Sequence, residues 1–366
     1  MENKPTILHT EASTGWGGQE IRVFEESLRM TARGYRVIIA APEKSLLNKK
    51  AAAAGIAIFD MEFNKKDPRS FLRMASLITR EKVDILNTHS SADSWVATIA
   101  AYLSGRKPKV IRTRHLSTPI SRSILSRIIY DMLPDAVITT GEAIKDRMVR
   151  HNGFRADKII SIPTGVDLKR FSHKDVRPCI IQTGFHIGII GVLRNWKGHT
   201  YLLDALPALL NKIKDLHLYI VGDGPQAGNL KKKVRAMGME GNVFFLGHRE
   251  DIPEIMASLD IVVHPSYESE GVPQSILQAM AMHKPVIASD VGAISEAVIN
   301  NHTGILLKPR DPALITDSIL RLYSDPQLRA SMGREAGILV EKRFSIDAMA
   351  DKVERLYRGL GKKRGR

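Results

Sequence analysis

The chain contains two successive runs in which short apolar segments alternate with longer segments of helical periodicity. In the first run the apolar segments, which predict strands, lie at residues 6–9, 35–40, 56–59, 85–87, 110–113, 136–139 and 159–162. Segments with helical spacing lie among them, at residues 20–33, 70–81, 94–104, 121–132 and 142–152. Strands that alternate with helices in this way predict a parallel sheet covered by helices on both faces.

The same alternation begins again near residue 187. The expected strands are residues 187–191, 216–221, 243–246, 261–264 and 286–288, and the expected helices are residues 200–213, 229–237, 252–258 and 275–282. A polar stretch at residues 172–183, which contains Pro178, separates the two runs and predicts a linker. We therefore expect an α/β protein with doubly wound domains at residues 1–171 and 184–349, followed by further helical sequence.

The net charge of the chain indicates which kinds of molecule it is suited to bind. The chain of 366 residues has a net charge of +15, and residues 1–170 hold 28 Lys and Arg against 18 Asp and Glu. Such a surplus suits a membrane surface, a nucleic acid, an acidic glycolipid or a nucleotide sugar. The single cysteine, Cys179, excludes a disulfide framework, and neither a signal peptide nor a membrane span is predicted. We expect a cytoplasmic protein.

The loop after the expected strand 261–264 carries the most informative chemistry. It contains Glu270, and Gly271, Val272 and Pro273 then lead into a helix. At the carboxyl ends of parallel strands, free backbone N–H groups and the positive end of a helix attract phosphate. The segment therefore predicts a ligand crevice, whereas the plainer interpretation is a strand–loop–helix unit with solvated acids.

Two further loops join a strand to a helix and carry small or basic residues. Gly17 and Gly18 precede the expected helix 20–33, where glycine lets the backbone approach a ligand closely. In the second run Arg194 and Lys197 lie on one loop, spaced to neutralise a diphosphate from two directions. A plain turn and a pair of solvated cations are the alternatives.

Other strand ends carry candidate residues as well. His115 follows the strand 110–113 and could hydrogen-bond a substrate hydroxyl or exchange a proton near neutral pH, although such a histidine is more often structural. Gly222 lies in a turn after a strand, and Gly247 and Arg249 lie at another strand end, where a nucleobase could contact backbone. Nothing matches a Walker loop, a zinc ligand set or a nucleophile elbow, so no metal site is expected.

Together these segments resemble the retaining glycosyltransferases of family 4, which have the GT-B fold. The resemblance spans nearly the whole chain, and the order and spacing of its motifs are more specific than any one motif. The motifs are Gly17-Gly18-x-Glu20, Thr113-x-His115, Ile162-Pro-x-Gly-Val-Asp167, Lys197-Gly198, Val221-Gly-Asp-Gly-Pro225, Glu270-Gly-x-Pro and Pro285-Val-Ile-Ala-Ser. The resemblance implies two Rossmann-like domains facing across a cleft, with a C-terminal helix at about residues 350–366 completing the first domain.

The resemblance also implies a role for each matched residue. Those expected at the diphosphate are Gly17, Gly18, Arg194, Lys197, Gly271, Val272 and Pro273. Those expected at the nucleotide are Gly222, Gly247, Arg249 and Gln278. His115 and Glu270 would contact the donor sugar and, with Lys197, form the expected catalytic set.

Two positions depart from the family pattern. Gln278 stands where the family has the second Glu of its E-x7-E motif, so it can hydrogen-bond ribose hydroxyls but carries no charge. Val192 stands where the family often has an arginine, and Arg194 is two residues further on.

The resemblance implies transfer of a sugar from a nucleoside diphosphate donor, with retention at the anomeric carbon and without a metal or cofactor. The expected acceptor is a glycan or a lipid-linked molecule, as in the synthesis of lipopolysaccharide or surface polysaccharide. Residues 120–132 place apolar side chains at helical spacing with Arg122 and Arg127 between them. Core packing is the commoner cause of this pattern, but a basic amphipathic helix can also rest on the inner face of an anionic membrane.

Two alternatives remain at this point. One is a nucleotide-sugar 2-epimerase with the same architecture, which would convert the donor without an acceptor. The other is a non-enzymatic, basic protein that binds nucleic acid or a membrane. No recognisable nucleic-acid module is present, so a nucleic-acid partner is not expected.

Overall fold

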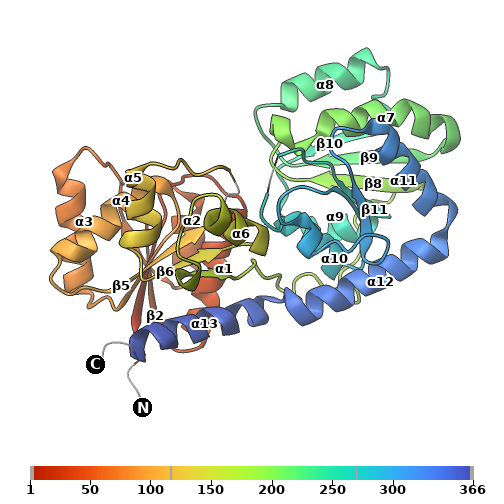
Figure 1. Ribbon diagram of the computed structural model, residues 1–366. Coiled ribbons are helices and arrows are strands. Elements are labelled where there is room, and N and C mark those ends of the chain that lie inside the picture. The colour runs from red at the N-terminus through yellow and green to blue at the C-terminus, as the bar shows by residue number, and fades with distance from the viewer. Residues whose placement is uncertain (1–3, 116–117, 269, 363–366) are drawn as a thin grey trace. The chain divides into compact units, whose positions relative to one another are not determined.

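The structure, a computed structural model, describes residues 4–115, 118–268 and 270–362. The chain divides into two compact units, one made of residues 1–164 and 346–366 and the other of residues 165–345. Each unit is a sheet with helices packed around it (Figure 1). The expected α/β class with two Rossmann-like domains is therefore confirmed.

The first unit contains a parallel sheet with the strand order β3-β2-β1-β4-β5-β6-β7. Its strands are β1 (Thr6–Thr10), β2 (Arg36–Ala41), β3 (Ala57–Asp60), β4 (Ile85–Thr88), β5 (Lys109–Arg114), β6 (Ala136–Thr139) and β7 (Ile159–Ser161). Its helices are α1 (Gly18–Ala32), α2 (Leu46–Ala53), α3 (Pro68–Arg80), α4 (Ser91–Leu103), α5 (Ile124–Arg127), α6 (Glu142–Arg150) and α13 (Ile346–Lys362). Because β1 lies between β2 and β4, the direction of winding reverses between β1 and β4.

Helix α13 returns from the end of the chain to the first unit and covers one face of its sheet (Figure 1). Val353 and Tyr357 of this helix are fully buried against Ile7 and Ile111 of the sheet. The opposite face is covered by α3 and α4, which bury Leu77 and other apolar side chains. Residues 363–366 of the expected C-terminal helix lie outside the described residues.

The second unit contains a parallel sheet with the strand order β10-β9-β8-β11-β12-β13. Its strands are β8 (Phe185–Ile190), β9 (Leu216–Val221), β10 (Val243–Gly247), β11 (Ile261–His264), β12 (Val286–Ser289) and β13 (Gly304–Leu307). Its helices are α7 (His199–Lys212), α8 (Ala227–Ala236), α9 (Ile252–Ser258), α10 (Gln274–Ala281), α11 (Pro312–Ser324) and α12 (Pro326–Arg343). Here the winding reverses between β8 and β11.

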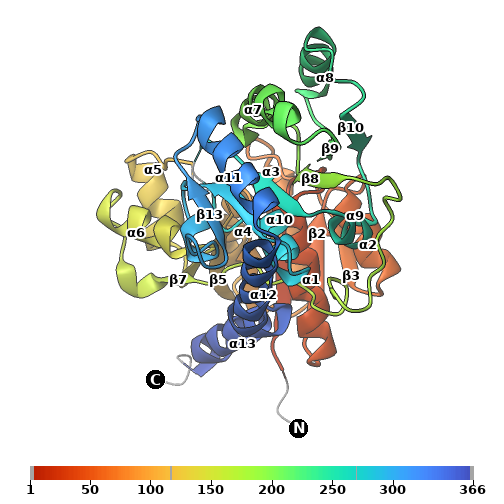
Figure 2. The same cartoon turned by 90° about the vertical axis from the view of Figure 1, so that its right-hand side faces the viewer.

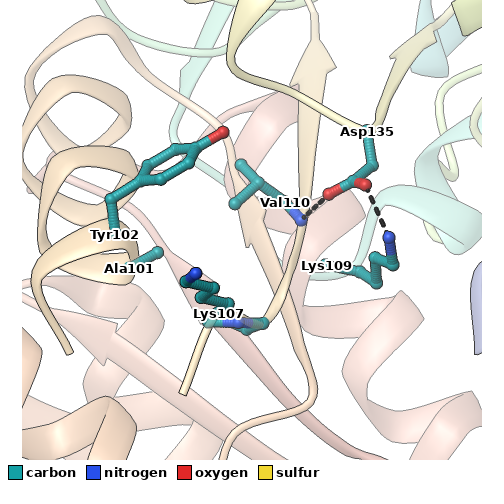
Figure 3. Close-up of a pocket in the computed structure, with 7 residues that line it drawn as sticks. Ala101, Tyr102, Lys107, Lys109, Val110 and Asp135 are labelled. Carbon is teal, nitrogen blue, oxygen red and sulfur yellow. Dashed lines mark hydrogen bonds and ion pairs between the residues drawn. The ribbon is translucent and has the colours of Figure 1, made fainter. Parts of the chain in front are cut away.

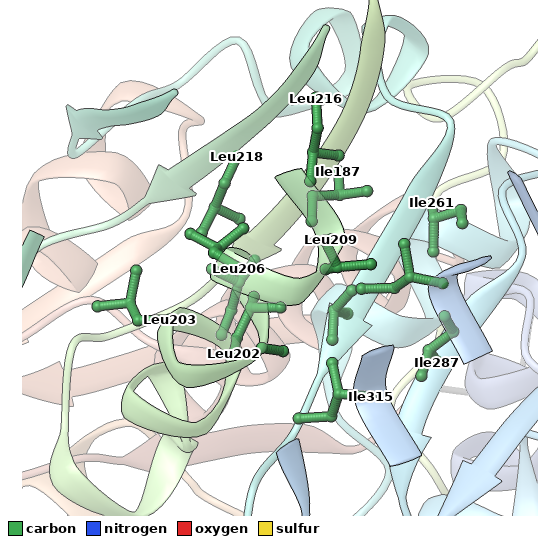
Figure 4. Close-up of a cluster of buried hydrophobic side chains, with 14 of the residues drawn as sticks. Ile187, Leu202, Leu203, Leu206, Leu209, Leu216, Leu218, Ile261, Ile287 and Ile315 are labelled. Carbon is green, nitrogen blue, oxygen red and sulfur yellow. The ribbon is translucent and has the colours of Figure 1, made fainter. Parts of the chain in front are cut away.

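The core of the second unit forms where α7 and α11 pack on the sheet (Figure 4). Leu202 and Leu206 lie on one face of α7, at the helical spacing of four residues, and are completely buried. They pack in one cluster with Ile187 of β8, Ile261 of β11 and Ile315 of α11. This core holds the strand ends and their loops in fixed positions.

The expectation of a linker at residues 172–183 needs correction, because that segment belongs to the second unit. The amides of Cys179 and Ile180 both donate to Ser258 Oγ, at 2.9 and 3.0 Å. The chain instead crosses between the units after residue 164 and again after residue 345. The polar composition of residues 172–183 therefore reflects a mostly exposed surface segment rather than a domain boundary.

Three elements differ from the sequence expectation. Helix α2 was not expected, and it begins after Ser45, whose side chain accepts a hydrogen bond from the Asn48 amide. Strand β13 was also not expected; it is a four-residue edge strand, and only three of its residues, Ile305, Leu306 and Leu307, are apolar, too short a run to mark a strand on its own. The helix expected at residues 121–132 begins at Ile124, and residues Ile128–Met132 form a π-helical turn.

Candidate functional site

Two loops lie side by side at the point where the winding of the second sheet reverses. They follow the neighbouring strands β8 and β11, and the amide of Tyr267 donates to the carbonyl of Trp196 at 2.9 Å. Gly198 has a φ of 75°, and a side chain there would place Cβ only 1.9 Å from the carbonyl oxygen of Pro265. A glycine after Lys197 is therefore required for the two loops to touch.

The contact between these loops brings Lys197 and Glu270 together. Lys197 Nζ lies 2.5 Å from Glu270 Oε2, and the two side chains are only 19% and 16% exposed. The other carboxylate oxygen lies 3.3 Å from Nε2 of His264, whose side chain is 4% exposed. Sequence reasoning selected Lys197 and Glu270 but missed His264, which ends β11 directly before the Glu270 loop.

The charge on Glu270 is stabilised by its neighbours. Burial alone raises the pKa of a carboxyl, but Lys197 and His264 outweigh this effect and hold the pKa of Glu270 well below its usual range. Burial also lowers the pKa of His264, although Glu270 opposes that shift. Because a carboxylate only accepts hydrogen bonds, His264 donates from Nε2, and its Nδ1 accepts from the Ser275 hydroxyl at 3.4 Å.

The loop after β12 contacts the backbone of Glu270 and fixes its position. The amide of Ala293 donates to the Glu270 carbonyl at 2.9 Å. Gly292 has a φ of 63°, and a side chain there would place Cβ 2.1 Å from the same carbonyl oxygen. Loops after three adjacent strands, β8, β11 and β12, thus fix the position of one carboxylate.

The remaining candidates come after Glu270 in the sequence, in the rest of its loop and in helix α10. Val272 is 5% exposed and Pro273 is the N-cap residue of α10. Gly271 is half-buried, and so is Gln278, whose carbonyl accepts from the Met282 amide at 3.1 Å. The first turn of α10 therefore follows Glu270 directly, with its positive end at the loop.

The other nucleotide and diphosphate residues expected in the second unit lie at or just after the ends of the neighbouring strands β8, β9 and β10. Arg194 is exposed, with its guanidinium 5.0 Å from the centre of the Trp196 ring. The amide of Gly222 donates to the carbonyl of Gly247 at 2.8 Å, so these two glycines are in contact. Arg249 forms a bidentate pair with Asp251, with contacts of 2.7 and 2.5 Å, and its guanidinium is thus already engaged.

In the first unit, Gly17 and Gly18 begin helix α1. Gly17 is the N-cap residue with extended backbone, and its amide donates to the Glu20 carboxylate at 2.8 Å. A Cβ added at Gly18 would meet nothing within 4 Å. Neither glycine is required by a left-handed backbone, so their effect is to leave the first turn of α1 uncovered.

His115 is the outermost of three histidines in contact. His9 lies near the end of β1, His89 comes directly after β4, and His115 comes directly after β5. His9 Nδ1 lies 2.9 Å from His89 Nε2, and His89 Nδ1 lies 2.9 Å from His115 Nε2. Since β1, β4 and β5 are neighbours in the sheet, three strand ends place these rings in one row, which we call the histidine row.

Sequence reasoning missed Glu11, the first residue after β1. It is fully buried, and burial together with repulsion from Asp93 raises its pKa to about 8, against the opposing hydrogen bonds from Ser13 and Gln19. Asp93 is also fully buried, and burial raises its pKa. The position of an acidic residue directly after a strand was the available signal.

The segment at residues 120–132 lies on the surface. Ile124, Leu125 and Met132 are 67%, 58% and 61% exposed, so core packing does not explain this part of the pattern. Helices α5 and α6 lie near one another in the first unit (Figure 2). A groove of about 480 Å³ beside the exposed side chains is lined by Arg122, Arg127, Arg150 and His151 among others. The lining has no acidic residue.

A second pocket, of about 170 Å³, lies at the amino ends of strands β5 and β6 (Figure 3). Lys109 Nζ pairs there with Asp135 at 2.9 Å, and Tyr102 lies beside them. It is lined by residues at the start of β5 rather than its end, so it is separate from the loops described above.

The described residues contain no cluster of three or more His, Cys, Asp or Glu side chains arranged to hold a metal ion. Within the same residues, no helix combines the length and the apolar character that crossing a membrane requires.

The fold is that of the GT-B glycosyltransferases. A glycosyltransferase from Rickettsia africae ESF-5 superimposes with a TM-score of 0.88, at 24% identity and with 98% of each chain covered. Anabaena HepE, solved in complex with UDP, superimposes with a TM-score of 0.85, at 20% identity, over 97% of this chain and 100% of that chain.

The sequence identifies the family. Residues 16–170 match the family described as Glycosyltransferase Family 4, and residues 184–325 match the one described as Glycosyl transferases group 1. The UDP-Gal:alpha-D-GlcNAc-diphosphoundecaprenol alpha-1,3-galactosyltransferase of Escherichia coli is 28% identical over 310 residues, or 80% of this chain and 79% of the relative. The chain belongs to glycosyltransferase family 4 and is a glycosyltransferase.

The ion pair predicts a strong coupling in stability. Lys197→Met leaves the buried Glu270 charge without its partner, and Glu270→Gln leaves Lys197 unpaired, so each should cost about 3 kcal/mol in the free energy of unfolding. The double variant removes both charges and should cost at least about 1 kcal/mol less than the sum. Urea denaturation of the four proteins measures the coupling, and strictly additive losses would contradict the pair as described.

The raised pKa of Glu11 predicts a pH effect. Between about pH 5 and pH 8 the folded protein holds this proton while the unfolded chain, with an ordinary carboxyl pKa, loses it. The stability from Glu11 is therefore complete below about pH 4.5 and is lost as the pH rises through 8.

In Glu11→Gln the neutral amide removes this dependence. The Tm of the variant relative to wild type should rise by about 5 °C or more from pH 5 to pH 9. Glu43→Gln, at an exposed position in the same unit, is the matched control and should show a constant difference. A constant difference for Glu11→Gln would show that this carboxyl titrates normally.

Proposed function

We propose that this protein transfers a sugar from a nucleoside diphosphate donor to a glycan or lipid-linked acceptor, with retention at the anomeric carbon. The observation that carries the proposal is the Lys197–Glu270 pair, held where the winding of the second sheet reverses. Ligands of doubly wound sheets bind at such points. A lysine and a carboxylate there offer one group for a phosphate and one for sugar hydroxyls.

In this proposal the pair opens to receive the donor. Lys197 exchanges the Glu270 carboxylate for the donor diphosphate, and Glu270 accepts hydrogen bonds from sugar hydroxyls. Arg194 is exposed on the same loop and adds a second positive charge. The low pKa of Glu270 supports an acceptor role, because the carboxylate stays ionised across the physiological range.

Bond cleavage places negative charge on the departing diphosphate. The bond from the anomeric carbon to the diphosphate oxygen breaks, and the acceptor oxygen bonds to the same face of that carbon. The acceptor proton passes to the leaving phosphate oxygen. Lys197, Arg194 and the positive end of α10 stabilise the charge that develops, which is the contribution that such a reaction needs most. We propose that these groups suffice without a metal or cofactor.

The other residues take the parts that the family resemblance implies. We assign the nucleotide to Gly222, Gly247, Arg249 and Gln278, and the diphosphate also to Gly17, Gly18, Gly271, Val272 and Pro273. Arg249 uses Nε and Nη2 toward Asp251, so Nη1 is the nitrogen that it offers to a ligand while the pair stays intact. His115 is assigned a donor-sugar contact. Gln278 keeps hydrogen-bonding capacity toward ribose without charge.

The acceptor is proposed to be lipid-linked, within lipopolysaccharide or surface polysaccharide synthesis. The Escherichia coli relative is named for a diphosphoundecaprenol acceptor. Exposed Ile124, Leu125 and Met132 beside a groove lined by arginines form a surface of the kind that rests on anionic lipid. We therefore propose that the enzyme works peripherally at the inner face of the membrane.

The donor site can be tested directly. A thermal-shift screen with UDP, GDP and ADP sugars should raise the Tm for one nucleotide class in the wild type. Glu270→Gln should lower kcat by about 100-fold or more, because it removes a charged contact to the reacting sugar. Glu268→Gln, two residues away and exposed, is the matched control and should retain turnover.

The products distinguish transfer from epimerisation. An NMR spectrum of the products should show a new glycosidic linkage with the donor's anomeric configuration, and only when acceptor is present. Conversion of the donor sugar without an acceptor would establish a 2-epimerase instead. Turnover of Glu270→Gln at the wild-type rate would remove Glu270 from the site.

The membrane surface predicts binding to vesicles. Wild-type protein should float with anionic liposomes at low salt, and less with neutral ones. Ile124→Ser combined with Leu125→Ser should weaken binding at least about tenfold, because each apolar side chain contributes roughly 1.5–3 kcal/mol when fully buried. Leu72→Ser, at a 65% exposed position on α3, serves as the control. No flotation of the wild type at low salt would overturn this part of the proposal.

A further inference from the structure

The inner end of the histidine row faces a buried carboxylate. His9 Nε2 lies 3.8 Å from Glu26 Oε1, and both side chains are fully buried. Glu26 projects from α1, so the row connects a helix inside the first unit with His115 at the end of β5. The row and this carboxylate combine residues from α1 and from three strand ends, at β1, β4 and β5.

Every neighbour of Glu26 is a hydrogen-bond donor. Arg22 Nε donates to Oε2 at 3.2 Å, and the Tyr357 hydroxyl donates to Oε1 at 2.6 Å. Asn87 Nδ2 lies 3.5 Å from Oε1. These contacts use both Oε1 and Oε2 as acceptors, so His9 Nε2 faces an acceptor oxygen.

The rings of the row are neutral. Burial lowers the pKa of His9, and Arg22 adds to the effect although Glu26 opposes it. Burial lowers the pKa of His89 and of His115 further, and the positive charges of Arg22 and Arg112 contribute. Each neutral imidazole carries one N–H and one bare nitrogen.

Neutral rings leave the row two arrangements. At each contact one nitrogen donates and the other accepts, so all three rings carry the proton on Nε2 or all three carry it on Nδ1. Protons on Nδ1 would turn the bare Nε2 of His9 toward the Glu26 carboxylate, which is repulsive. Protons on Nε2 place the N–H of His9 toward that carboxylate, which is attractive.

We infer that Glu26 sets the tautomer of His115 through His9 and His89. All three rings then carry the proton on Nε2, and His115 is left with a bare Nδ1. The ring of His115 is half-buried, and Nδ1 has no hydrogen-bond partner among the described residues. His115 therefore presents an acceptor for a ligand hydroxyl, while Glu26, His9 and His89 are positioning residues.

The ligand part of this inference rests on the proposed function, in which His115 contacts the donor sugar. A sugar hydroxyl that donates to His115 keeps its own oxygen free to accept from other groups. The opposite tautomer would offer an N–H in the same place and would favour a different hydroxyl geometry. The tautomer itself is a property of the ligand-free protein and can be measured without any substrate.

The test is the tautomer of each histidine in full-length protein labelled with ¹⁵N-histidine. Long-range ¹H–¹⁵N correlation spectra separate protonated from bare ring nitrogens, and at pH 7.5 His115 should be protonated at Nε2. In Glu26→Gln the amide oxygen stays with Arg22, so its NH₂ group faces His9. The row should then reverse, and His115 should carry its proton on Nδ1.

Controls make the result specific. Glu25→Gln, the neighbouring residue on α1, should leave the spectrum of His115 unchanged. Should Glu26→Gln fail to fold, His9→Phe cuts the row from Glu26, and His115 should then populate both tautomers. A wild-type His115 protonated on Nδ1, or an unchanged tautomer in a folded Glu26→Gln protein, would overturn the inference. Absence of sugar transfer with the expected tautomer would instead count against the proposed function alone.

Discussion

The second unit is organised around a carboxylate that remains ionised although it is largely buried. Removing a carboxylate from water is costly unless an opposite charge and hydrogen bonds replace the solvent. Lys197 supplies that charge from the neighbouring loop, and His264 supplies a hydrogen bond from the end of β11. The close approach of these loops depends on two glycines, Gly198 and Gly292, whose neighbours leave no room for a side chain.

The two units solve the same problem in different ways. Both place polar residues on loops where the winding of a parallel sheet reverses, since the carboxyl ends of adjacent strands meet there. In the second unit the buried groups form a charged pair. In the first unit the histidine row is neutral, and the carboxyl of Glu11 holds its proton to about pH 8. A charged pair suits a diphosphate, whereas neutral rings suit uncharged hydroxyls.

Much of this arrangement could be predicted from the sequence, because local patterns determine it. The alternation of apolar and helical segments predicted the two sheets, and the position of Lys197 and Glu270 after neighbouring strands selected the pair that the structure brings together. Contacts between distant segments could not be predicted. Tyr357 donates to Glu26 across 331 positions of sequence, and no local pattern marks either residue as polar core. The polarity of residues 172–183 suggested a linker because composition alone does not distinguish a linker from an anchored surface segment.

The return of α13 to the first unit has a consequence for how the protein is made. Its residues Val353 and Tyr357 cover a face of the sheet that begins with β1, yet they are synthesised after the whole second unit. Until α13 has been synthesised, the apolar side chains of Ile7 and Ile111 lack this cover. The second unit can complete its core on the ribosome before α13 is made, whereas the first unit, although it emerges earlier, is completed after the second. The nascent chain therefore carries an open hydrophobic surface while the second unit is synthesised, the kind of surface to which chaperones bind.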